Sequence, residues 1–155
     1  MSADVGAASV WSERAGDPTL PAVFLIHGSM DRSAGLLRLS RRLDRTHAVV
    51  RFDRRGYGRS IDVGPPHTVE ANVDDLERLL ASHGRDDRPV ALFGHSFGGN
   101  IALAFTARRP ELVSTVTVYE TPMSWLSTWP GGTAGGAAMG AETPAAAALT
   151  SSRPT

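Results

Sequence analysis

Four short apolar runs are spaced along the chain, at residues 22–26, 47–52, 90–93 and 112–119. Runs of this length, rich in branched and aromatic side chains, predict β-strands. The first three show no regular alternation of polar and apolar positions, which is typical of strands buried on both faces. An earlier stretch, 5–14, loosely alternates small, apolar and polar residues and predicts one further strand at a sheet edge.

Between these runs, Leu and Val recur every three or four residues, which predicts amphipathic helices. The stripes consist of Leu36, Leu39 and Leu43, and then of Val69, Val73, Leu76, Leu79 and Leu80. Thr68 stands where a helix N-cap is expected and Gly84 where a helix stops. A third helix is predicted over 100–109, ended by Pro110. The alternation of strands and helices implies right-handed crossovers, a mostly parallel sheet and a three-layer α/β sandwich.

The last part of the chain has a different composition. Of the 25 residues from Gly131 to Thr155, 21 are Gly, Ala, Ser, Thr or Pro. Such a segment has almost nothing to bury, so we expect it to be a disordered tail. The predicted organisation is therefore one folded domain over 1–130 and a low-complexity tail over 131–155.

Composition excludes several classes of function. All sixteen basic residues are Arg, and they balance sixteen acidic residues, so the net charge is zero and gives no footprint for nucleic acid or an anionic membrane. The chain has no Cys, which excludes disulfides and thiolate chemistry. No signal peptide or membrane-length apolar run is evident. We expect a cytoplasmic protein with a small-molecule substrate and with neither a cofactor nor a metal.

The strongest motif is Gly94-His95-Ser96-Phe97-Gly98, which follows a predicted strand and precedes a predicted helix. A sharp strand-to-helix turn exposes a serine hydroxyl, and glycines on both sides give it room. A serine hydroxyl is a weak nucleophile that needs a neighbouring base to take its proton. The motif in this context predicts a nucleophile elbow centred on Ser96.

Two further stretches lie at the ends of predicted strands, His27-Gly28-Ser29-Met30 and the glycine-rich loop from Asp53 to Ser60. With the elbow, they follow the order of the general α/β-hydrolase family (esterases, lipases and haloperoxidase-like enzymes), which the chain resembles from its first apolar run to Tyr119. The resemblance implies a serine hydrolase of small esters or related acyl compounds. It also implies that Gly28 belongs to the oxyanion turn, that the N–H groups of Ser29 and Phe97 form the oxyanion hole, and that Asp53 holds its own loop.

The family's catalytic triad runs in the order Ser, acid, His, and no histidine follows Ser96 in this chain. Glu120, at the end of the last predicted strand, is the most plausible acid by position, but it has no histidine to orient. The five histidines all precede Ser96 in the sequence, and none is expected to be the base; His95 is expected to point away from the hydroxyl. We therefore expect an incomplete α/β-hydrolase fold that lacks its C-terminal strands, truncated and inactive. The alternatives are a non-catalytic binding module that uses the exposed sheet edge, and an inert fragment.

Overall fold

The computed structural model describes residues 9–123, which contain one five-stranded sheet with the order β1-β3-β2-β4-β5. The strands are β1 (Ser12–Ala15), β2 (Ala22–Ile26), β3 (Ala48–Phe52), β4 (Val90–His95) and β5 (Val113–Tyr119). All neighbouring strands are parallel except β1, which runs antiparallel to β3. Among the described residues, β1 and β5 are therefore the two edges.

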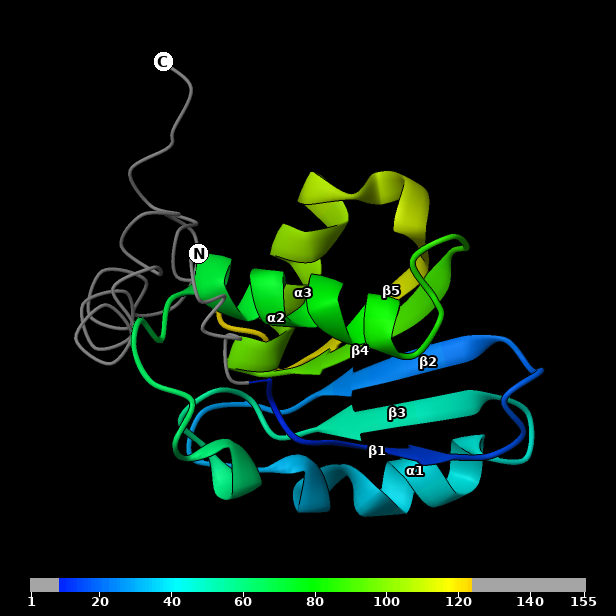
Figure 1. Ribbon diagram of the computed structural model, residues 1–155, viewed down its shortest axis with the longest axis horizontal. Helices are drawn as coiled ribbons and strands as arrows, with labels where there is room; N and C mark the ends of the chain where they lie inside the picture. The colour runs from blue at the N-terminus through cyan, green and yellow to red at the C-terminus, as the bar shows by residue number, and fades with distance from the viewer. Residues whose placement is uncertain (1–8, 124–155) are drawn as a thin grey trace, which may run out of the picture.

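Three helices cover the two faces of this sheet, α1 (Leu37–Leu43), α2 (Val69–Ser82) and α3 (Phe97–Arg108). The helix α1 lies against one face, and α2 and α3 lie together against the other (Figure 1). Short 3₁₀ turns cover Ser33–Leu36, Gly58–Ser60 and Pro110–Leu112. The three-layer α/β sandwich predicted from the sequence is confirmed.

The sequence of β2 is a continuous apolar run because both faces of this strand are buried. Its Phe24 and Ile26 belong to the larger core, shared with α2 and α3. Its Val23 and Leu25 belong to a second core on the side of α1. Each face of the strand therefore contacts a helical layer, and a polar residue at any of these positions would be buried without water.

The helix α2 starts and stops where the sequence predicts. The Thr68 side chain accepts a hydrogen bond from the Ala71 N–H at 3.1 Å, as an N-cap does. After the helix, Gly84 adopts φ +64°, the left-handed conformation that ends many helices. Local side-chain chemistry therefore fixes both ends of this helix.

Two predicted boundaries are wrong. Of the strand predicted over 5–14, residues 5–8 lie outside the described residues, and residues 9–11 are not in a strand; the strand runs over Ser12–Ala15, and the Trp11 N–H before it donates to the Ser60 hydroxyl. The helix predicted over 100–109 begins earlier, at Phe97, since two glycines form part of its first turn. The predicted tail, 131–155, lies outside the described residues, so its disorder and the boundary at residue 130 stay predictions.

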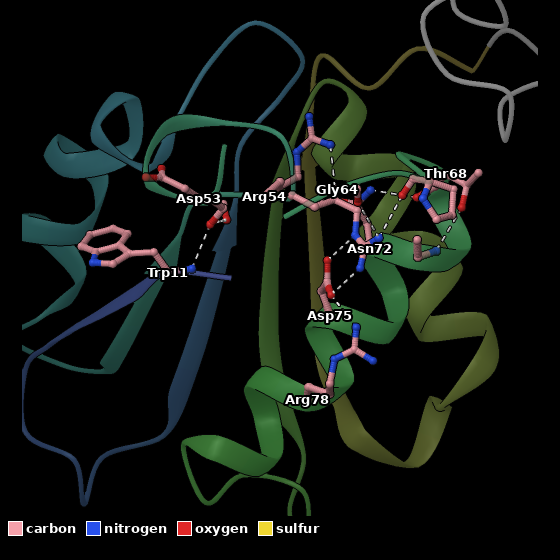
Figure 2. A network of polar contacts seen from close by, with 12 residues as sticks. Trp11, Asp53, Arg54, Gly64, Thr68, Asn72, Asp75 and Arg78 are labelled. Carbon is pink, nitrogen blue, oxygen red and sulfur yellow. Dashed lines mark hydrogen bonds and ion pairs between the residues drawn. The ribbon is translucent and has the colours of Figure 1, made fainter. Parts of the chain in front are cut away.

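The loop after β3 is tied to α2 by a buried ion pair. The Arg55 guanidinium meets the Asp75 carboxylate through two contacts, at 2.6 and 2.9 Å. Asp75 also accepts a hydrogen bond from Arg78 at 2.6 Å (Figure 2). The Arg55 side chain completes its hydrogen bonding on the carbonyl of Pro66 at 3.0 Å. This two-point contact between a planar cation and a carboxylate fixes the loop relative to the helix.

The start of α3 lies directly against the end of β2. A methyl group at Gly98 would overlap the carbonyl oxygen of Ile26 and lie 2.7 Å from that of His27. Both clashing groups are main chain, which cannot turn away as a side chain can. The spacing of helix and strand at this point therefore requires glycine.

We predict that Gly98→Ala lowers the free energy of unfolding by about 3 kcal/mol or more, because inserted volume must displace main chain. Gly64→Ala is the matched control, since a methyl group there meets nothing within 4 Å. That control should be neutral or stabilise by less than about 1 kcal/mol. Urea unfolding monitored by circular dichroism compares the two, and equal stability would contradict the close approach.

Candidate active site

Ser96 lies at the sharp turn between β4 and α3. Its backbone angles, φ 51° and ψ −123°, are unusual for a residue other than glycine. Although Ser96 occupies the N-cap position of α3, its hydroxyl makes no capping hydrogen bond. Its N–H donates to the Tyr119 carbonyl at 2.9 Å, which ties the turn to the end of β5. A strained backbone that leaves a hydroxyl uncommitted is a common property of functional sites.

Gly94 and Gly28 both lie close to this turn, and neither position has room for a side chain. A methyl group at Gly94 would lie 2.5 Å from the Gly98 carbonyl oxygen. A methyl group at Gly28 would lie 2.9 Å from Cβ of Ser96. The main chain leaving β2 therefore passes beside the Ser96 side chain, although the two residues are far apart in sequence.

The two predicted oxyanion donors lie on either side of this contact. Ser29 directly follows Gly28 and is half-buried. Phe97 is the first residue of α3, and its side chain is fully buried. The N–H groups of a helix's first turn have no carbonyl partner within the helix, and the helix dipole favours negative charge there. An anion at Ser96 would find both features.

His27 is buried and holds the turn that follows β2. Its Nε2 accepts a hydrogen bond from the Arg54 N–H at 3.0 Å, and its Nδ1 lies 2.8 Å from the Gly28 carbonyl oxygen. Burial, and then the positive charge of Arg54, lower the pKa of His27 to about 4, so the ring is neutral at pH 7. Since Nε2 accepts, Nδ1 carries the proton and donates to Gly28. Both nitrogens are occupied, which leaves neither for a base.

Asp53 organises the glycine-rich loop after β3. Its carboxylate accepts N–H groups from Ser33 at 2.7 Å and from Arg59 at 3.0 Å. Burial alone would raise the pKa of Asp53, but these donors outweigh it and hold the pKa below its ordinary value. The Ser60 hydroxyl donates to the Asp53 carbonyl at 2.7 Å. Asp53 thus has the structural task that the sequence predicted.

Glu120 lies close to the imidazole of His95. Its carboxylate oxygen Oε2 lies 3.7 Å from Nε2 of His95. The pairing register of β4 and β5 brings this about, because it sets His95 beside Tyr119. Glu120 itself adopts φ 50° at the exposed end of β5. This contact does not supply the missing triad histidine, because His95 precedes Ser96 and no histidine follows it.

Within residues 9–123, the Ser96 hydroxyl makes no capping hydrogen bond to α3. The hydrogen bonds of His47 and His83 are to Thr46 and Ser12, and the His67 ring lies against Gly56. The described residues contain no cluster of three potential metal ligands. None of their helices has the length and hydrophobicity required to span a bilayer.

Sequence reasoning missed Arg54, whose buried guanidinium lies between the Tyr57 and Phe97 rings. A charged residue that follows a strand is normally read as solvent-exposed. The available signal was its position, directly after Asp53, where the chain turns into the site.

We predict that His27 makes stability depend on pH. Its pKa is 6.5 in an ordinary setting and about 4 in the folded protein, so only the unfolded chain binds the proton between these values. Its contribution to stability is complete above pH 6.5 and falls as pH drops toward 4, by up to about 1.4 kcal/mol per unit. Urea unfolding of wild type and His27→Gln at pH 7.5 and 5 should show a smaller pH effect in the variant. Equal effects would contradict a neutral, buried His27.

A scan against family models matches the description "Alpha/beta hydrolase family" over residues 23–154. The chain is 36% identical over 104 residues to Lipase LipV of Mycobacterium tuberculosis, covering 66% of this chain and 38% of the lipase. It is 34% identical over 118 residues to a mouse sn-1-specific diacylglycerol lipase, covering 75% of this chain and 37% of that enzyme. The chain thus spans less than two fifths of the length of either relative.

Solved structures agree with this match. A marine microorganism esterase superposes with a TM-score of 0.71 at 23% identity, over 86% of this chain and 51% of that one. An alpha/beta hydrolase from Sphaerobacter thermophilus gives a TM-score of 0.62 at 29% identity, with the same coverage. Since the matching family model covers most of the sequence, the chain belongs to the α/β-hydrolase family.

Proposed function

We propose that this chain supplies the nucleophile and the oxyanion hole of a serine hydrolase that acts on a small ester or a related acyl compound. Ser96 attacks the acyl carbon, and the N–H groups of Ser29 and Phe97 stabilise the oxyanion that forms. Two such donors each contribute a few kcal/mol to the transition state. No metal or cofactor takes part in this proposal.

One observation carries the proposal, namely the uncapped Ser96 hydroxyl on a backbone of positive φ. A serine at a helix N-cap normally binds a backbone N–H of the first turn. Here the hydroxyl makes no capping hydrogen bond among the described residues, and Cβ of Ser96 lies close to Gly28. A purely structural turn gains nothing from this arrangement, whereas a nucleophile needs it.

The substrate class follows from the relatives together with the fold. Two of them carry the name lipase, one of these for sn-1-specific action on diacylglycerol. A solved structural neighbour is an esterase. All three names describe cleavage of an ester bond. We therefore propose an ester or a related acyl compound as the substrate of this chain, and no narrower class.

In this proposal, the chain provides no catalytic base for Ser96. Both nitrogens of His27 are hydrogen-bonded. Nε2 of His95 faces the carboxylate of Glu120, and no hydrogen bond joins its Nδ1 to Ser96 among the described residues. The remaining histidines, His47, His67 and His83, contact residues away from the turn. We therefore propose that Glu120 has no catalytic role with Ser96 here, and that the chain alone turns esters over very slowly. An oxyanion hole without its triad still retains about 10³- to 10⁴-fold acceleration over water.

We predict that a fluorophosphonate probe modifies Ser96 slowly, over hours. The Ser96 oxygen bonds to phosphorus as fluoride leaves, water takes the hydroxyl proton in place of a catalytic histidine, and the phosphoryl oxygen lies in the oxyanion hole. Intact-mass spectrometry follows the adduct, and peptide mapping locates it. Turnover of p-nitrophenyl acetate should be at most about 10³- to 10⁴-fold above the uncatalysed rate, which is far below the rate of an enzyme with a complete triad.

The matched control is Ser96→Ala, which should give no adduct while unfolding at the same urea concentration within error. Equal labelling of wild type and this variant would place the reactive group elsewhere and reject the proposal. Absence of labelling together with cooperative unfolding would also reject it, in favour of a non-catalytic binding module that uses the β5 edge.

A further inference from the structure

Arg54 is a buried cation with no carboxylate against its guanidinium among the described residues. Only 3% of the residue is exposed. Burial lowers the pKa of Arg54 to about 10, so the side chain remains charged at neutral pH. A charge taken out of water is costly unless neighbouring groups replace the lost hydration. The contacts of this guanidinium therefore show what the charge is used for.

All the hydrogen-bond acceptors of the guanidinium are neutral oxygens around the turn. Its Nε donates to the His27 carbonyl at 2.9 Å, and Nη2 donates to the Gly28 carbonyl at 3.0 Å. Its Nη1 reaches Oδ1 of Asn72 on α2 at 3.5 Å (Figure 2). Two consecutive carbonyls of the chain leaving β2 are thus bound by one rigid group.

Aromatic rings enclose the same guanidinium. Its central carbon lies 4.7 Å from the centroid of Tyr57 and 4.9 Å from that of Phe97. Attraction between a cation and an aromatic face replaces part of the lost hydration. Because Phe97 begins α3, Arg54 contacts both segments that carry the proposed oxyanion donors, the Gly28–Ser29 link on one side and the first turn of α3 on the other.

The Gly28 carbonyl and the Ser29 N–H belong to one planar peptide unit, and they point in opposite directions from it. Fixing the carbonyl oxygen therefore fixes the direction of the N–H. The oxygen accepts from Arg54 on Nη2 and from His27 on Nδ1, which lies at 2.8 Å. The Arg54 main-chain N–H also holds His27 in the tautomer that donates to this oxygen. Arg54 thus positions both hydrogen-bond donors of the Gly28 carbonyl, namely its own Nη2 and Nδ1 of His27.

We propose that Arg54 is a positioning residue that aims the Ser29 N–H at the oxyanion formed at Ser96, by binding the Gly28 carbonyl with its side chain. A charged donor on a carbonyl also polarises the peptide, which makes its N–H a stronger donor. The second half of this proposal rests on the proposed function, because it requires an oxyanion at Ser96. The first half, control of the peptide, does not.

The fork of arginine matters for this task. A lysine ammonium is a single point on a flexible stem and cannot hold two consecutive carbonyls in a fixed geometry. Arg54→Met removes charge and donors while keeping a long side chain between the rings. Arg54→Lys keeps a cation but loses the fork, and it serves where the Met variant does not fold.

The direct test is the amide signal of Ser29 in the ¹H–¹⁵N spectrum of the whole chain, since a donor on the preceding carbonyl shifts this nitrogen. We expect the Ser29 signal to move in Arg54→Met, and to move in the same direction but less in Arg54→Lys. Asn72→Ala is the matched control, because it removes the third partner of Arg54 and leaves both carbonyl contacts in place. Its Ser29 signal should stay near the wild-type position.

The kinetic test separates binding of the fluorophosphonate from its reaction. Misplacing one oxyanion donor should lower the first-order rate constant of phosphonylation about tenfold to a hundredfold in Arg54→Met. The half-saturating probe concentration should change little, because the oxyanion forms only in the transition state. A merely structural role would affect unfolding and leave this split unchanged.

The outcomes distinguish the two proposals. An unmoved Ser29 signal in a folded Arg54 variant overturns the positioning role, whatever the labelling shows. A moved signal with an unchanged rate constant overturns the link from the peptide to catalysis. If wild type is not labelled at all, the proposed function fails, and the Ser29 signal alone decides whether Arg54 controls the peptide.

Discussion

The site depends on one constraint, which is that two segments far apart in sequence, the chain leaving β2 and the turn from β4 into α3, must approach each other too closely for a side chain at Gly28 or Gly98. At one contact, Gly98 at the start of α3 lies against the carbonyls that end β2. At another, Gly28 lies against Ser96. Main-chain groups cannot rotate out of a close contact as a side chain can. Other groups must therefore hold each contact in place. The Arg54 guanidinium supplies this support at the end of β2, since it binds the carbonyls of His27 and Gly28.

Arginine performs this bonding of loop carbonyls in several places. Arg54 binds those of His27 and Gly28, Arg55 binds that of Pro66, and Arg85 binds those of Pro18 and Leu20. Loops cannot pair their carbonyls in a ladder or a helix, and buried carbonyls without a donor are costly. A planar cation with several N–H groups meets this need from one side chain. Part of the arginine content, which looks from sequence like solvated surface charge, is therefore internal.

The features that the sequence predicted depend on periodicity, and those it missed depend on tertiary contacts. Continuous apolar runs predicted β2 and β4, because a strand covered on both faces tolerates few polar residues. The sequence pattern did not predict the start of α3, because Gly98 and Gly99 are poor helix formers. Close packing against neighbouring segments requires glycine at both positions. The contact of His95 with Glu120 depends on which residues of β4 and β5 lie opposite each other, and no local pattern specifies that register. The role of Arg54 depends on burial, which a single charged letter does not reveal.

The hydrogen bond from the Ser96 N–H to the Tyr119 carbonyl has a consequence for the order of assembly. A chain synthesised from its N-terminus presents the elbow sequence before the strand that supplies this acceptor. Until β5 has paired with β4, the serine amide has no partner from this strand, and the strained turn lacks one of its constraints. The backbone conformation of Ser96 therefore depends on the pairing of β5 with β4, and not on the elbow sequence alone.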